Sequence, residues 1–201
     1  IEEMEKIVSS AMLSGAIGFS TSTFEGHNGY KGIPMPSRLA SLLEHQRLAK
    51  AMAVNGRGIY MLTRGSKTSL KDIESISYFS KRPAMVAALL HNPLNPNGVI
   101  NQLDRMEKAS LSGIELWGQV SCRPLTMEFT MTNPYMFEGF DSWQPILKAN
   151  SLNKREQLLA DTEVRDSLRE ELLNFKKVRV FNGDWEKIIF CQSSNIKYKS
   201  L

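Results

Sequence analysis

This sequence of 201 residues has few cysteines, no long apolar run and no strong charge imbalance. The two cysteines, Cys122 and Cys191, are fewer than a secreted disulfide framework usually needs, so a reducing, cytoplasmic location is expected. The longest apolar run, at 84–90, is too short to cross a bilayer, so no membrane partner is expected. A composition of 42% hydrophobic and 23% charged residues excludes a wholly disordered or collagen-like chain and is typical of a globular protein.

The charge balance is nearly even, with a net charge of +4. Between Lys176 and Lys199 six Lys or Arg residues stand against two acids, with aromatic residues among them. A surface for single-stranded nucleic acid has this composition. A solvated strand with buried aromatic side chains alternates in the same way, and we favour this interpretation. No nucleic-acid partner is therefore expected, and a basic nucleic-acid-binding module remains a minor alternative.

The two ends of the chain suggest a piece of a longer protein. Residue 1 is Ile, and it stands at the head of a helical pattern. That pattern places apolar residues on one helix face: Met4, Ile7, Val8, Ala11 and Met12. The last stretch, 185–201, has no capping element. We expect an internal fragment that is inactive and prone to aggregate by itself.

Four apolar stretches, at 16–20, 58–63, 84–90 and 114–121, have the character of buried strands. Amphipathic helices are expected between them: one at 39–54, one opening at a capping box formed by Ser69 and Asp72, and one from about 99 to Gly113. Turns are expected at Asn92-Pro93 and 95–96. Strands that alternate with helices predict an α/β fold with a parallel sheet. Four such units make half of an eight-fold barrel or a small open sheet.

After the regular βα units of about 1–123, the segment 124–201 is irregular, and we expect both to belong to a single domain, 1–201. Helices are expected at 154–159 and 162–175. The second of these has an apolar inner face: Val164, Leu168, Leu172 and Phe175. Strands at 177–181 and 187–191 are expected to flank a turn at Asn182-Gly183.

Ligand sites of parallel α/β proteins form at the carboxyl ends of the strands. Polar residues follow each predicted strand there, in four clusters: Ser20-Thr21-Ser22, Thr63-Arg64, His91-Asn92 and Ser121-Cys122-Arg123. Helix caps and turns use the same residue types, so each residue alone is a weak signal. Together they predict the rim of a pocket.

The histidines and the first cysteine allow several interpretations. His45 lies in a predicted helix beside Glu44, so a surface position is expected. His27, in a glycine-rich loop, is a candidate substrate contact, and His91 is a candidate metal ligand or acid–base group. For Cys122 a buried structural role is favoured over a thiolate nucleophile. The spacing of Cys and His matches no zinc module, and the sequence contains no P-loop, GxGxxG or GxSxG motif.

Several motifs occur in the same order as in one family. The run SGAIGFSTSTFEGHNGYKGIPMPSRLAS, at 14–41, resembles the GFSTS…H…G-x-P-x-PSR-x-A stretch of the N-acyl-D-amino-acid deacylases, or D-aminoacylases. GRGIYMLT and GQVSCRPL resemble later segments of that family, as does the stretch from Phe140 to Leu172. This family belongs to the metal-dependent amidohydrolase superfamily.

The resemblance implies a (β/α)8 TIM-like barrel, incomplete at both ends in this chain. It implies hydrolysis of the amide C–N bond of an N-acyl-D-amino acid or a related small amide, with zinc or another divalent metal. The family's His-x-His ligands and catalytic Asp would lie outside the chain. His91 is then the one metal-ligand candidate, because the strand ending in Thr63-Arg64 lacks the histidine of the classical members.

The resemblance and the strand-end positions also suggest roles in binding a small-molecule amide substrate. Arg64 or Arg123 would bind the substrate carboxylate, and the hydroxyls of Ser20, Thr21 and Ser22 would hydrogen-bond the acyl group or the carboxylate. His27 and its neighbouring glycines would form a mobile lid. The missing strand histidine leaves an alternative open, in which a catalytically degenerate barrel serves as a binding or scaffold protein.

Overall fold

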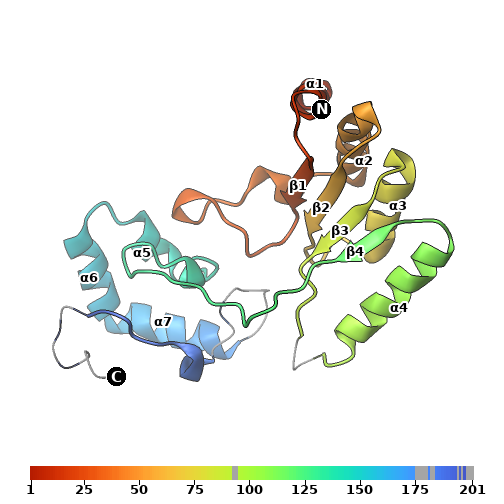
Figure 1. Cartoon of the computed structure of the whole chain (residues 1–201). Coiled ribbons are helices and arrows are strands. Elements are labelled where there is room, and N and C mark those ends of the chain that lie inside the picture. Colours follow the sequence, from red (N-terminus) through yellow and green to blue (C-terminus); the bar gives the residue numbers. More distant parts are fainter. Residues whose placement is uncertain (92–94, 175–180, 182–183, 194, 196, 198–201) are drawn as a thin grey trace. The chain divides into compact units, whose positions relative to one another are not determined.

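The chain forms two compact units. A computed structural model describes residues 1–91, 95–174, 181, 184–193, 195 and 197 (Figure 1). The first unit comprises Ile1–His27 and Pro34–Met127, and the second comprises Asn28–Ile33 and Glu128–Leu201. In these described stretches, no helix combines the length and the apolar character that a bilayer span requires.

A four-stranded parallel sheet organises the first unit. Its strands are β1 (Gly18–Ser22), β2 (Ile59–Thr63), β3 (Ala84–Ala87) and β4 (Leu116–Gly118). They lie in the order β1-β2-β3-β4, so every strand pairs with its neighbour in the sequence. The α/β class and the parallel sheet predicted from the sequence are thus confirmed.

Helices precede and connect the strands. They are α1 (Glu2–Leu13), α2 (Leu42–Met52), α3 (Leu70–Ser80) and α4 (Gly98–Leu111), with short 3-10 turns η2 (Pro36–Leu39) and η3 (Ala53–Asn55). The predicted capping box opens α3: Ser69 Oγ accepts a hydrogen bond from the Asp72 amide at 3.2 Å, and the Asp72 carboxylate accepts one from the Ser69 amide at 2.7 Å. These bonds satisfy amides that the first turn of a helix leaves unpaired.

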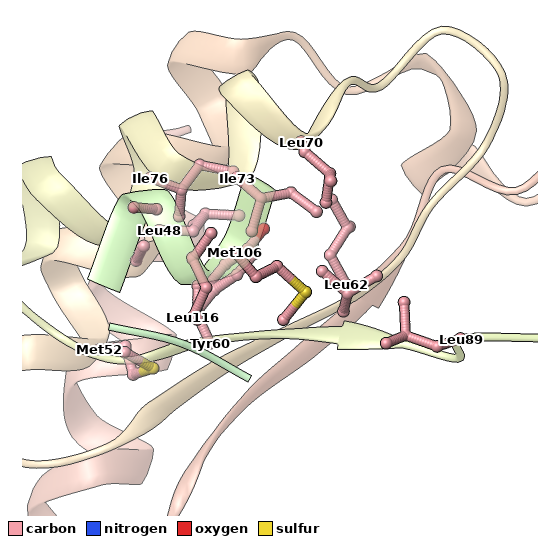
Figure 2. Close-up of a cluster of buried hydrophobic side chains, with 14 of the residues drawn as sticks. Leu48, Met52, Tyr60, Leu62, Leu70, Ile73, Ile76, Leu89, Met106 and Leu116 are labelled. Atoms are coloured by element: carbon pink, nitrogen blue, oxygen red, sulfur yellow. The ribbon is translucent and has the colours of Figure 1, made fainter. Parts of the chain in front are cut away.

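The core of the first unit lies between the helices and one face of the sheet. Tyr60 pairs in register with Ala84, and Ala84 pairs with Leu116, so their side chains point to the same face. Side chains of α2, α3 and α4 pack on this face, as Figure 2 shows. Figure 1 likewise places these three helices on one side of the sheet. Burial of this apolar surface is the main stabilising contribution available to the unit.

The opposite face of the sheet is more open to solvent. Met61 and Met85, which pair in register, are half-buried there. Trp117, the next residue in the same row, is 54% exposed. Helices therefore cover one face of the sheet, whereas the other face is more exposed to solvent.

All four predicted strands have different boundaries in the structure, although the second differs only in beginning at Ile59 rather than 58. The first begins at Gly18 rather than 16, because the turn after α1 continues to Ala16, whose amide donates to Ala11 O at 3.0 Å. It ends at Ser22, so Ser20, Thr21 and Ser22 belong to the strand instead of following it. The predicted strands at 84–90 and 114–121 shorten to β3 and β4, which end where the ladder pairing stops.

The prediction that His45 lies on the surface is wrong. His45 is only 4% exposed, and its Nδ1 lies 2.7 Å from the Tyr60 hydroxyl oxygen. Helix α2 turns His45, Leu48 and Met52 toward the sheet, whereas Leu39, the first residue of the helix predicted at 39–54, precedes α2 and is 87% exposed. Burial lowers the pKa of His45, outweighing the nearby carboxylates of α2 and α3, so the ring is neutral near pH 7.

The second unit is built around aromatic side chains. Its elements are η1 (Tyr30–Gly32), η4 (Tyr135–Phe137), α5 (Gln144–Lys148), α6 (Leu152–Ala160), α7 (Thr162–Leu173) and η5 (Trp185–Lys187). The Phe137 ring lies 5.0 Å from that of Trp143 and 5.6 Å from that of Phe181, between centroids. Such offset and edge contacts add to the stabilisation from buried area.

The sequence-based expectations for this second unit are met in part. Val164, Leu168 and Leu172 of α7 pack against the aromatic core, as predicted. The expected strand at 187–191 is wrong, since Lys187 ends η5 and the residues after it form no strand. Four other expectations concern residues outside the described ones: Phe175 on the helix face, the strand at 177–181 except for its last residue, and the turns at Asn182-Gly183 and Asn92-Pro93.

The buried His45 predicts a pH dependence of stability. Its pKa is depressed in the folded state, so the unfolded chain binds more protons and the free energy of unfolding falls as the pH drops below about 6.5. His45→Gln keeps a hydrogen-bonding group but cannot titrate. Urea unfolding between about pH 7 and 5 should show a shallower pH dependence in His45→Gln, by at most about 1.4 kcal/mol per pH unit, the limit for one proton.

The matched control is His91→Gln, which alters an exposed histidine. This variant should keep the pH dependence of the unmodified protein. Equal slopes for His45→Gln and His91→Gln would contradict a neutral, buried His45.

Candidate functional site

The carboxyl ends of β1 and β2 hold a polar network that joins the two loops after these strands. Ser22 and Thr63, the last residues of the two strands, pair in register. The Thr23 amide donates to Thr63 O at 2.9 Å, which continues the pairing by one step. The loops that follow the strands therefore leave the sheet side by side.

Thr23, Gly65 and Thr68 connect these two loops. Thr23 Oγ1 lies 2.8 Å from Thr68 Oγ1 and accepts a hydrogen bond from the Gly65 amide at 3.0 Å. All three residues are buried. Position 65 has room only for glycine, because a Cβ there would lie 2.2 Å from the Thr23 carbonyl oxygen. Buried polar groups that are fully paired in this way fix one loop geometry.

An acidic residue adds a further contact between the same loops. The Glu25 carboxylate accepts hydrogen bonds from the Ser66 amide at 2.9 Å and from the Ser66 hydroxyl. Burial opposes ionisation of Glu25, but the hydrogen bonds from Ser66 and from its own backbone, together with the charge of Arg38, outweigh it, so the pKa of Glu25 lies below its ordinary value. Glu25 is therefore a carboxylate near neutral pH, held by its neighbours.

A serine and a histidine meet at the centre of this network. Ser22 Oγ lies 2.6 Å from His27 Nδ1 and accepts a hydrogen bond from the Phe24 amide at 3.2 Å. The Phe24 amide occupies one acceptor position of Ser22. When the ring proton of His27 is on Nδ1, it donates to the second acceptor position of Ser22 and leaves the serine hydroxyl proton for a ligand; the other tautomer reverses this bond. The Phe24 ring supports His27 edge-on, with centroids 5.1 Å apart.

The environment keeps His27 neutral. Burial lowers the pKa of His27, and the positive charge of Arg38 lowers it further. A neutral imidazole that already contacts a hydroxyl can accept a proton, and the pair can orient a polar ligand atom. Ser22 and His27, both predicted from the sequence as substrate contacts, are thus brought together by the fold.

Arg64 is tied to the protein itself. Its Nη2 donates to Gln102 Oε1 at 2.8 Å, and its Nη1 donates to Thr68 O at 3.3 Å. These bonds link the end of β2 to α4 and occupy two of the guanidinium nitrogens. Arg123 differs, because its exposed guanidinium makes no hydrogen bond or ion pair with any residue that the structure describes. Of the two arginines, Arg123 has more donors available for a ligand.

The remaining predicted residues are dispersed. Ser20 is exposed in the middle of β1, and Thr21 is half-buried on the helix-covered side. His91 does not end a strand as expected: β3 stops at Ala87, and His91 is exposed beyond it. Cys122 is exposed, so the expected buried position is wrong. Asn92 lies outside the described residues.

The zinc implied by the family resemblance can be tested against these side chains. Across the described ranges, no three His, Cys, Asp or Glu side chains gather as a metal centre requires. The residues present do not fit a complete site, and we derive no catalytic step through a metal.

Most of the supporting network was not predicted from the sequence. Thr23, Glu25, Gly65 and Thr68 were not singled out, although each lies in a polar stretch directly after a strand. That position is the available signal, because adjacent parallel strands bring their following loops together.

No family model, curated protein or solved structure matches the chain.

The close approach at Gly65 predicts a steric effect. Gly65→Ala should push the two loops apart and lower the free energy of unfolding by roughly 1–3 kcal/mol, as overpacking of a tight site does. Urea denaturation followed by circular dichroism measures this change.

Gly139→Ala is the matched control, since a Cβ there meets no atom within 4 Å. It should leave the unfolding midpoint almost unchanged. A Gly65→Ala protein as stable as the control would contradict the tight contact between the loops.

Proposed function

We propose that this chain is part of a metal-dependent amidohydrolase that hydrolyses the amide C–N bond of N-acyl-D-amino acids or related small amides. The observation that carries the proposal is the Ser22–His27 pair at the carboxyl edge of a parallel sheet, where α/β enzymes bind their substrates. Both residues lie within the motif at 14–41 that resembles the N-acyl-D-amino-acid deacylases. The substrate would be a small molecule.

The sheet supports a barrel as the complete fold. Strands of a (β/α)8 barrel follow each other in sequence order and carry their helices on the outer face, whereas a doubly wound sheet has helices on both faces. Here the order is β1-β2-β3-β4, and the core helices lie on one face. We infer that the chain supplies four consecutive units of such a barrel and that its open face would line the interior.

Different residues of the chain would bind different groups of the substrate. Ser22 would hydrogen-bond the acyl carbonyl or the carboxylate, and neutral His27 would hold or accept a proton beside it. Arg123, whose guanidinium is available, would bind the substrate carboxylate in a bidentate manner, while Arg64 positions the loop after β2. Zinc or another divalent ion is implied by the resemblance, with its principal ligands outside this chain.

Arginine substitution tests the binding role in the natural protein that carries this sequence. Arg123→Ala should lower kcat/KM for N-acetyl-D-amino acids by roughly 10²-fold, since a charge-assisted bidentate contact is lost. The assay measures the free amine released, with the L enantiomers for comparison. Arg57→Ala, an exposed arginine before β2, is the control and should retain full activity.

Each outcome has a distinct meaning. Unchanged kcat/KM in Arg123→Ala would refute the carboxylate role. Binding of N-acyl-D-amino acids without any amine release, in protein supplied with zinc, would refute the enzyme and favour a degenerate barrel that serves as a binding protein.

A further inference from the structure

The second unit contains a pocket of about 570 Å³. The residues around it come from the segment before η1, the loop around Pro134, and helices α5 and α6. They are Asn28, Gly29, Tyr30, Thr132, Asn133, Pro134, Tyr135, Glu138, Leu147 and Arg155. All of them belong to one compact unit. The volume falls within the range of pockets that bind small molecules.

One positive charge lines this pocket. Arg155, in α6, is half-buried, and its Nη1 donates to Thr132 O at 2.8 Å. Within the described part of the chain, its guanidinium has no other hydrogen bond and no ion pair. This single bond orients the side chain and leaves several N–H donors for a ligand. A planar guanidinium held in this way matches a carboxylate.

One negative charge lines the same pocket. The carboxylate of Glu138 is half-buried and makes no hydrogen bond or ion pair with the residues that the structure describes. Burial raises the pKa of Glu138, because the charged form has lost solvent without gaining a partner. The pKa of Tyr135 is also raised, first by burial and then by the charge of Glu138, which places that carboxylate close to the phenol. A cationic ligand group would supply the missing partner.

The rest of the wall combines polar side chains, from Asn28, Thr132 and Asn133, with apolar surface. Pro134 and Leu147 are buried behind it and support the wall. The tyrosine rings of the lining add apolar surface with a polar tip. A ligand with an apolar group beside its two charges would therefore contact these rings.

We propose that this pocket binds a small zwitterion, with its carboxylate on Arg155, its ammonium on Glu138 and an apolar body against the rings of Tyr30 and Tyr135. The two opposite charges in one pocket carry this inference, because neither is neutralised by a described neighbour. The proposal concerns residues of the second unit alone and does not depend on the amidohydrolase reaction.

Three probes that share a phenylethyl skeleton test the charge pattern by calorimetry on the natural protein. Phenylalanine carries both charges, 3-phenylpropanoate carries the carboxylate alone, and 2-phenylethylamine carries the amine alone. Phenylalanine should bind with a Kd of about 1 mM or tighter, and each single-charge analogue roughly tenfold more weakly. This comparison requires no variant, so it remains decisive even if a substitution impairs folding. Equal affinities for all three probes, or no phenylalanine binding at about 10 mM, would overturn the proposal.

Two variants assign the charges to residues. Arg155→Gln should weaken phenylalanine and 3-phenylpropanoate roughly tenfold and leave 2-phenylethylamine unchanged. Glu138→Gln should show the reverse selectivity, with phenylalanine and 2-phenylethylamine weakened. Arg165→Gln and Glu156→Gln, exposed positions outside the pocket, are the controls and should bind all three probes as the unmodified protein does. A folded Arg155→Gln protein that binds phenylalanine normally would refute the site.

Discussion

The parallel register of the four strands is the constraint on which the first unit depends. It places Tyr60, Ala84 and Leu116 in one row beneath the helices, so that burial of this row and formation of the sheet occur together. The same register brings the carboxyl ends of β1 and β2 level with each other. Because Ser22 and Thr63 are paired there, the following loops are close enough to form a single polar network. The register that packs one face of the sheet thus also positions the polar side chains at its carboxyl edge.

The polar network shows how the chain holds a pair of reactive groups in place. Ser22 and His27 contact each other directly, whereas Thr23, Gly65 and Thr68 set the path of the loops around them. These supporting residues are buried and paired, so their hydrogen bonds resist exchange with water. Arg64 extends the support to α4 through Gln102. The network therefore restricts the conformational freedom of the Ser22–His27 pair before any ligand binds.

Local signals in the sequence predicted the parts of the structure that depend on local interactions. The capping box at Ser69 and the inner face of α7 were found because caps and helical periodicity involve neighbouring residues. The ends of β1, β3 and β4 were misplaced, because pairing with another strand, and not apolar character, decides where a strand stops. His45 was misassigned because its burial depends on a distant partner, the Tyr60 hydroxyl. The contact of His27 with Ser22 depends on a loop conformation that no periodicity encodes.

The sequential strand order also affects the route of folding. Among the strands of the described residues, each pairs only with the strand of an adjacent βα unit, and the two paired strands nearest in sequence are β2 and β3, joined through α3. The entropy lost on closing a loop grows with its length, so this pair forms at the lowest entropic cost. Assembly can then extend outward, with β4 docking on one side and β1, separated by the longest connection, on the other. The polar network between β1 and β2 would accordingly be among the last features of the first unit to form.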